Sequence, residues 1–187
     1  MSRIVGGVLG GRRLVVPAGR EVRPTSDRAR EALFGTVGSV LELAGARVLD
    51  LYAGSGAVGL EALSRGAEHA LLVEADAAAA AAISANVTAL ALTGRATLAR
   101  DRVERLLRTG PPGPPYHLIF ADPPYALPDE QVDAVLAALA EHGWVGPDAV
   151  VVIERSSRGA GPAWPSSLRP MKQRRYGGGT LWYGRAT

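Results

Sequence analysis

The stretch Val48–Ala62, "VLDLYAGSGAVGLEA", holds the pattern that decides the fold. Its first part is an apolar run typical of a buried strand, and its last part has the composition of a helix. Between them Gly54, Ser55 and Gly56 form a tight turn, and Gly59 follows shortly after. Glycines at such a turn let a ligand approach the backbone at a helix N-terminus, where N–H groups point outward. The stretch therefore predicts a strand–loop–helix unit that binds a nucleotide-like cofactor.

The residues around this unit alternate between apolar strands and helices. We expect strands at residues 46–52, 69–76, 95–100, 117–121 and 149–155, and helices at residues 55–66, 77–92, 101–110 and 128–143. The strands carry little polar alternation, as is usual for a parallel sheet covered by helices on both faces. The alternation predicts a doubly wound α/β sheet, in which ligands bind outside the carboxyl ends of the strands.

The N-terminal end departs from this alternation. Two short apolar pieces, around residues 4–5 and 14–16, are joined through glycine-rich sequence and predict a β-hairpin. Residues 25–43 then predict an amphipathic helix, which Thr25 or Ser26 can cap.

The C-terminal end departs from it as well. Residues 171–184 predict two strands around a glycine-rich turn at 177–179, so we expect an antiparallel hairpin to close the sheet. No linker is long enough to separate independent domains. We therefore expect one α/β domain over residues 23–187, preceded by a small β-hairpin extension that contacts RNA over residues 1–22.

The composition excludes several kinds of site. Cysteine is absent, which rules out disulfides, thiolate–metal sites and cysteine nucleophiles. The three histidines have no acidic or histidine neighbours at ligand spacing, so we expect no metal. No apolar run approaches the length of a membrane span, and the N-terminus lacks the features of a secretory signal. We expect a cytoplasmic protein that does not bind membranes.

Charge is unevenly distributed along the chain. Residues 1–35 hold seven arginines and three acids, residues 36–154 hold seven arginines and fifteen acids, and the residues after 154 hold seven basic residues and no acid. The net charges of +4, −8 and +7 add up to the +3 of the whole chain. A basic surface built by both ends would attract phosphates and release counterions. We assign RNA contacts to Arg12, Arg13, Arg20, Arg28, Lys172, Arg174 and Arg175.

Acidic residues lie at the ends of the first three strands of the α/β region. Asp50 lies in the first strand, and Glu74, eighteen residues past Gly56, ends the second at a distance that suits a ribose. Asp101 follows the third strand and can either accept from an adenine amino group or cap the next helix. Together with Asp122, these acids suit the sulfonium cation of S-adenosylmethionine better than the pyrophosphate of NAD. The strand ends therefore predict an adenosine site, with S-adenosylmethionine as the favoured cofactor.

The strand at residues 117–121 runs straight into Asp122-Pro123-Pro124-Tyr125. Proline fixes φ and lacks an N–H group, so the two prolines would hold this corner rigid. The Asp122 carboxylate and the Pro123 carbonyl oxygen can then accept both hydrogens of one exocyclic amine and align its lone pair with a methyl group. Tyr125 offers a flat face on which an extruded base can stack, at about 1–3 kcal/mol per base. Asp122 is not expected to cap the next helix, because that helix begins only several residues later.

The two motifs resemble those of a known enzyme class. Residues 50–56, "DLYAGSG", and the corner at 122–125 are similar to the glycine-rich and (Asn/Asp)-Pro-Pro-(Tyr/Phe) motifs of class I S-adenosylmethionine-dependent amino-methyltransferases. Tyr52 replaces the first glycine of the commonest pattern, a departure that this subgroup shares. Residues 3–17, "RIVGGVLGGRRLVVP", and residues 22–37, "VRPTSDRAREALFGTV", narrow the resemblance to the RsmD family, which methylates the N2 amine of a guanine in 16S ribosomal RNA.

The resemblance spans nearly the whole chain and implies a Rossmann-like class I methyltransferase fold, with a mostly parallel seven-stranded sheet and an antiparallel C-terminal hairpin. It implies S-adenosylmethionine as methyl donor, S-adenosylhomocysteine as product, and no metal. The substrate would be 16S ribosomal RNA within the 30S subunit or its precursor, and we expect a monomer. The catalytic residues would be Asp122, Pro123, Pro124 and Tyr125. Cofactor contacts are assigned to Arg23, Pro24, Thr25, Asp50, Tyr52, Ala53, Gly54, Ser55, Gly56, Glu74, Ala75, Asp101, Arg102 and Asp122.

Three alternatives remain open. An adenine-N6 or protein glutamine methyltransferase would use the same corner, because the corner fits any planar amine; the missing target-recognition domain argues against a sequence-specific DNA enzyme. An RNA-binding assembly factor without turnover would need no intact Asp-Pro-Pro-Tyr motif. An NAD(P)-linked oxidoreductase would need a Tyr/Lys or His/Asp pair to move a proton, and the sequence offers none.

Overall fold

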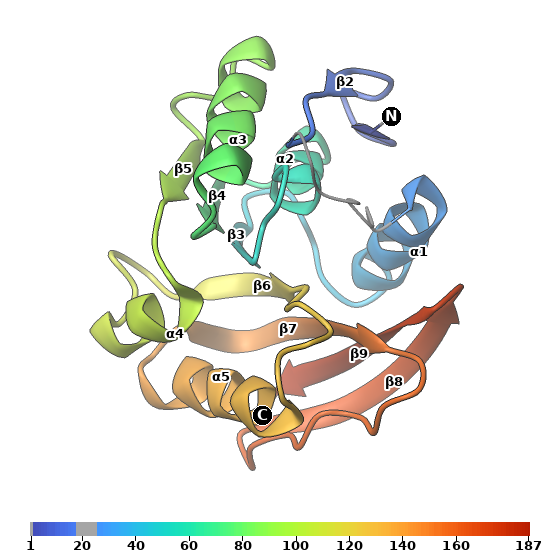
Figure 1. Ribbon diagram of the computed structural model, residues 1–187, viewed down its shortest axis with the longest axis vertical. Coiled ribbons are helices and arrows are strands. Elements are labelled where there is room, and N and C mark those ends of the chain that lie inside the picture. The colour runs from blue at the N-terminus through green and yellow to red at the C-terminus, as the bar shows by residue number, and fades with distance from the viewer. Residues whose placement is uncertain (1, 18–25) are drawn as a thin grey trace.

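The computed structural model describes residues 2–17 and 26–187. At its centre lies a seven-stranded sheet of order β5-β4-β3-β6-β7-β9-β8 (Figure 1). The strands are β3 (Arg47–Leu51), β4 (His69–Val73), β5 (Ala96–Ala99), β6 (Tyr116–Ala121), β7 (Val145–Ser156), β8 (Leu168–Tyr176) and β9 (Gly179–Ala186). The strands β3 to β7 pair in parallel, whereas β9 pairs antiparallel with both β7 and β8. The predicted Rossmann-like α/β fold with an antiparallel C-terminal hairpin is confirmed.

Helices cover both faces of the sheet, as the apolar strands predict. The helices α1 (Asp27–Gly38), α2 (Ala57–Ser64) and α3 (Ala77–Ala89) pack on one face, and α4 (Val103–Leu106) and α5 (Asp129–Glu141) pack on the other (Figure 1). A 3₁₀ turn at Leu107–Thr109 follows α4. The order of the strands reverses beside β3, because β4 lies on one side of it and β6 on the other. Such a reversal opens a crevice at the carboxyl ends of the two central strands.

Helix α1 is shorter than the sequence pattern predicts. Ser26 is its N-cap, with Oγ accepting a hydrogen bond of 3.2 Å from the N–H of Ala29, and the helix ends at Gly38. Val40 and Leu41 follow the helix and still pack against the core. The apolar stripe therefore outlasts the helix, because the loop after it is also pressed onto the sheet.

The N-terminal hairpin forms, but its strands differ from those expected. Strands β1 (Ser2–Arg3) and β2 (Arg13–Leu14) pair antiparallel over two residues each. The expected strands at residues 4–5 and 14–16 are wrong in part, because backbone groups there bind side chains of the main domain instead. The N–H of Val5 donates to Glu61 at 3.2 Å, and the N–H of Val15 donates to Asn86 at 2.7 Å.

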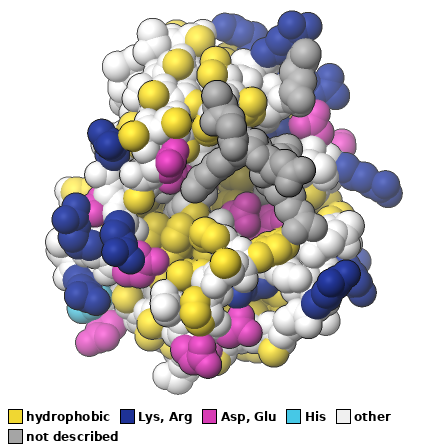
Figure 2. All heavy atoms as spheres, in the orientation of Figure 1, with side chains coloured by type: hydrophobic (Ala, Val, Ile, Leu, Met, Phe, Trp, Pro, Cys, Tyr) yellow, Lys and Arg dark blue, Asp and Glu magenta, His cyan; other side chains and the backbone are white. Residues whose placement is uncertain are grey.

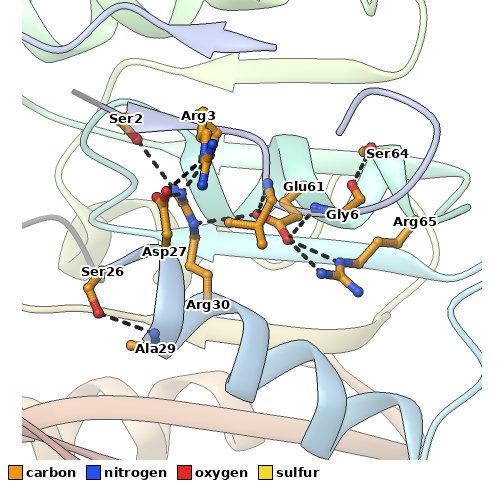
Figure 3. Close-up of polar contacts among 12 residues, drawn as sticks. Ser2, Arg3, Gly6, Ser26, Asp27, Ala29, Arg30, Glu61, Ser64 and Arg65 are labelled. Atoms are coloured by element: carbon orange, nitrogen blue, oxygen red, sulfur yellow. Dashed lines mark hydrogen bonds and ion pairs between the residues drawn. The ribbon is translucent and has the colours of Figure 1, made fainter. Parts of the chain in front are cut away.

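A buried ion-pair network holds the hairpin against α1 and α2 (Figure 3). Glu61 of α2 is fully buried; it accepts from the backbone N–H of Gly6 and pairs with Arg30 and Arg65. Arg30 also donates to the carbonyl of Arg3 at 2.6 Å. Burial lowers the pKa of Arg30, against the pull of the neighbouring carboxylates. Three segments distant in sequence are thereby tied together.

Among the described residues, no helix is long and apolar enough to cross a membrane. The predicted boundary between an extension at 1–22 and a main domain at 23–187 lies outside the described residues, and this division stays a prediction.

Candidate active site

The loop between β3 and α2 takes the backbone shape that its glycines allow. Gly54 and Gly56 have φ of +60° and +80°, a region that other residues seldom adopt. A methyl group on Gly56 would lie 2.8 Å from the Leu72 side chain, whereas one on Gly54 would meet nothing within 4 Å. Gly56 is thus required by packing, while Gly54 faces open space that a ligand can approach. Tyr52 also has positive φ, at +56°, and strain of this kind clusters at functional sites.

Asp50 of β3 lies beneath this loop, 2% exposed. Its Oδ2 accepts a hydrogen bond of 2.8 Å from the N–H of Gly59, in the first turn of α2. Burial raises the pKa of the Asp50 carboxyl to about 8, although the bond from Gly59 acts in the opposite direction. The carboxyl therefore fixes the start of α2 relative to β3.

Glu74 follows β4 and is turned toward the same loop. Its Oε2 accepts from the N–H of Gly54 at 2.9 Å, and its Oε1 accepts from the N–H of Asp76 at 2.9 Å. A carboxylate offers about four acceptor sites, so two bonds leave capacity for ribose hydroxyls. Two backbone donors thus fix the orientation of the carboxylate against the glycine loop.

Asp101 lies after β5 and before α4. Its Oδ1 accepts from the N–H of Arg102 and from Nε of Arg105, each at 2.6 Å, and these bonds lower the pKa of its carboxyl. Arg102 occupies the N-cap position of α4, so the interpretation of Asp101 as a plain helix cap is wrong. Both of these bonds end on Oδ1. The contact of Asp101 with an adenine amino group stays a prediction.

The other residues assigned to the cofactor lie around this loop in different ways. The Tyr52 hydroxyl donates to Oε1 of Glu104 at 2.7 Å, so the ring points toward α4 rather than into the glycine turn. Ser55 is buried, and its carbonyl accepts from Asn86 of α3. Ala53 donates its N–H to the carbonyl of Val73, and Ala75 and Arg102 are exposed. Arg23, Pro24 and Thr25 lie outside the described residues.

The Asp122–Tyr125 corner begins directly after β6, next to β3 in the sheet. The N–H of Asp122 donates to the carbonyl of Leu51 at 3.4 Å, so the corner starts beside the glycine loop. Leu118 and Phe120 face the side of α1 to α3, and side chains alternate along a strand, so Asp122 continues on that side. Helix α5 begins only at Asp129, so Asp122 is not its cap, as predicted.

Arg155, near the end of β7, clamps this corner from the opposite face of the sheet. Its guanidinium donates to the carbonyls of Pro124 and Leu127, at 3.2 and 2.8 Å, and pairs with Asp129 at 2.8 Å. The residue is 7% exposed. Sequence reasoning missed it, although a charged pair that ends the apolar run 149–153 was a usable signal.

The predicted basic residues do not form one cluster. Arg12 donates to the carbonyl of Ala89 at 2.8 Å, and Arg13 is exposed on β2. Arg28 is exposed in the first turn of α1. Lys172, Arg174 and Arg175 lie on β8, the outer strand of the sheet, and Arg20 lies outside the described residues. On the face seen in Figure 2, Lys and Arg side chains lie mostly around the rim and hydrophobic side chains gather in the middle.

Comparison with known proteins places this arrangement in a family. The model of the family described as "Conserved hypothetical protein 95" matches residues 2–185. Ribosomal RNA small subunit methyltransferase D of Escherichia coli (strain K12) is 36% identical over 167 residues, which cover 88% of this chain and 80% of that protein. YlbH of Bacillus subtilis is 34% identical over 181 residues, which cover 94% of each chain.

Solved structures show the same likeness. The structure of yhhF from E. coli has a TM-score of 0.85 at 30% identity and covers 98% of this chain and 97% of its own. The Thermus thermophilus 16S rRNA N2 G1207 methyltransferase, RsmC, solved with AdoMet and guanosine, has a TM-score of 0.67 at 22% identity. It covers 100% of this chain and 49% of its own, and at that identity the likeness shows the fold alone. The match over nearly the whole length, together with the glycine loop and the Asp-Pro-Pro-Tyr corner, shows that this chain belongs to the RsmD/YlbH family.

Proposed function

We propose that this protein transfers a methyl group from S-adenosylmethionine to the exocyclic N2 amine of a specific guanine in 16S ribosomal RNA. The substrate would be the 30S subunit or its precursor. One observation carries the proposal: the Asp122–Tyr125 corner follows β6 at the sheet edge where the glycine loop follows β3, and these two strands are hydrogen-bonded neighbours. A planar amine held by the corner would therefore lie beside a cofactor held by the loop.

The residues at the strand ends fit an adenosine-bearing sulfonium cofactor. Gly54 opens onto space, and Glu74 is oriented by two backbone N–H groups with acceptor capacity to spare. S-adenosylmethionine, when bound there, would supply a methyl group that an amine nitrogen can take by in-line displacement. The acidic character of Glu74 and Asp101 suits a cation and opposes a pyrophosphate.

The chain's own part in the reaction is positioning. Asp122 and the carbonyl of Pro123 would accept the two hydrogens of the amine, so that its nitrogen faces the methyl group. Arg155 holds the carbonyls of Pro124 and Leu127, which keeps the corner from moving when the amine arrives. Holding reacting atoms at a fixed distance and angle is worth several orders of magnitude in rate, because it removes the entropic cost of their encounter. The amine needs no strong base, since its nitrogen loses a proton readily once it is cationic.

Two relatives support ribosomal RNA as the substrate. The E. coli relative is named a small-subunit ribosomal RNA methyltransferase, and the B. subtilis relative is named a "putative rRNA methyltransferase". The exposed basic residues of β8 and of the start of α1 would bind phosphates on either side of the target.

Two variants test the proposal with purified protein. Asp122→Ala should lose methyl transfer to 30S particles while keeping S-adenosylmethionine affinity, because the corner touches the amine. Glu74→Ala should weaken cofactor binding by about 10-fold or more, since a carboxylate hydrogen bond contributes about 1.5–3 kcal/mol. Calorimetry gives the affinities and tritiated methyl transfer gives the rates. An active Asp122→Ala enzyme contradicts the proposed role of the corner, and methylation of duplex DNA in preference to 30S particles contradicts the proposed substrate.

A further inference from the structure

A second carboxylate lies next to Asp122 at the edge of the sheet. In the register of β6 and β7, Ala121 pairs with Ile153, so Asp122 and Glu154 come next on two neighbouring parallel strands. Neighbouring strands lie about 4.8 Å apart. On β7, Val150 and Val152 face α1 to α3, and Glu154 continues this alternation on the side where Asp122 lies. The fold therefore sets two acidic side chains side by side.

Glu154 also lines a cavity of about 530 Å³. Its other walls come from the start of α1, with Ser26 and Arg28, and from the end of β8, with Arg175 and Tyr176. A cavity of this size accommodates one nucleotide rather than a folded segment. Its wall thus combines one carboxylate with two exposed arginines that come from opposite ends of the chain.

The cavity adjoins the Asp122–Tyr125 corner at Gly179, one of the residues that line it. A methyl group on Gly179, at the start of β9, would lie 2.8 Å from Oε1 of Glu154 and 2.9 Å from the hydroxyl oxygen of Tyr125. The two side chains therefore meet over the bare backbone of Gly179. A base stacked on Tyr125 would present its edge to Asp122 and to Glu154 together.

The chemistry of this pair selects one base. In guanine, the N1–H and the N2 amine are adjacent donors on one edge, so two carboxylates side by side match them. In adenine, the ring nitrogen beside the N6 amine is an acceptor, which a carboxylate would repel. A site that hydrogen-bonds one group of a substrate rejects an analogue lacking it far more strongly than an apolar pocket does.

We propose that Glu154 is the residue that selects guanine: it accepts the N1–H of the target base in this cavity, while Arg28 and Arg175 bind its flanking phosphates. The inference rests on the proposed function and names the residue that separates guanine from adenine. It divides the labour at the corner, because Asp122 holds the amine that reacts and Glu154 reads the neighbouring N–H that does not.

The test uses 30S particles whose 16S RNA carries either guanine or 2-aminopurine at the methylated position, located beforehand by mass mapping. The base 2-aminopurine keeps the amine on C2 but has no hydrogen on N1. Wild-type enzyme should show a kcat/KM about 10- to 100-fold lower on 2-aminopurine, which is the effect of losing one hydrogen bond to a charged group. Glu154→Gln should reduce this preference by about 10-fold or more, because a side-chain amide can donate to the bare N1 of 2-aminopurine.

Glu141→Gln, at the exposed end of α5, is the matched control and should leave the preference unchanged. Equal rates of wild-type enzyme on both particles overturn the inference without any variant, so a poorly folding Glu154→Gln does not protect it. An unchanged preference in a folded Glu154→Gln overturns it as well. Failure of the wild-type enzyme to methylate guanine-containing particles would instead overturn the proposed function, and this inference with it.

Discussion

Removal of the Arg155 clamp should slow methyl transfer without weakening cofactor binding. Arg155→Met keeps most of the length of the side chain and deletes three contacts, to Pro124, Leu127 and Asp129. Hydrogen bonds that involve a charged group contribute about 1.5–3 kcal/mol each when they are buried. The Asp129 side chain is 58% exposed, so water screens that pair and it adds little.

The two carbonyl contacts therefore set the magnitude. They hold the loop between the Asp122–Tyr125 corner and α5, and at the magnitude given above their loss would cost about 3–6 kcal/mol of local stability. A displacement of about 1 Å at the reacting atoms can reduce the rate about 100-fold, so we expect kcat to fall by about 10- to 100-fold. The glycine loop and Glu74, which are proposed to bind the cofactor, follow β3 and β4, whereas Arg155 lies on β7. The Kd for S-adenosylmethionine should therefore change less than about twofold.

The assay is steady-state methyl transfer to 30S particles, with cofactor affinity measured by calorimetry. Arg158→Met, at an exposed position three residues later, is the control for the change of charge. A variant that loses thermal stability but keeps its kcat would refute the clamp as a positioning device. Equal losses in kcat and in cofactor affinity would instead indicate a general disturbance of the sheet edge.

Two further predictions concern the buried carboxyl and the glycine of the cavity. Burial raises the pKa of Asp50 to about 8, so between about pH 4 and pH 8 the folded protein keeps a proton that the unfolded chain has released. The free energy of unfolding should therefore fall as the pH rises through this range, by at most about 1.4 kcal/mol per pH unit. Asp50→Asn should flatten this slope in melting temperatures of the cofactor-free protein, and parallel slopes would contradict the assignment. Gly179→Ala should lower kcat about 10-fold or more, because its methyl group would collide with the hydroxyl of Tyr125. Gly94→Ala is the control and should leave kcat unchanged, because a methyl group there meets nothing within 4 Å. Equal values of kcat for the two variants would refute the contact.

The sequence predicted the sheet and its loops well for a physical reason. Strands buried on both faces are continuous apolar runs, and the residues that end such runs in a parallel sheet all lie at one edge. The glycine loop after β3, Glu74 after β4 and the corner after β6 could thus be assigned to one edge from their positions alone.

Other features depended on contacts that sequence patterns do not carry. Arg155 binds the carbonyls of residues that precede it by about thirty positions, and Glu154 is proposed to act beside Asp122. Only the register of β6 against β7 brings these parts of the chain together. The stripe that ends with Val40 and Leu41 predicted too long a helix, because burial of a loop and burial of a helix leave the same apolar signal.

The central claim is that a guanine amine in small-subunit ribosomal RNA receives the methyl group. Mass mapping of 16S ribosomal RNA from cells lacking this gene, compared with the parent strain, tests it most directly. The account predicts that one N2-methylated guanine disappears and returns when the wild-type gene is restored, but not with the Asp122→Ala gene. An unchanged set of methylated nucleotides, or the loss of a methylated adenine instead, would contradict it.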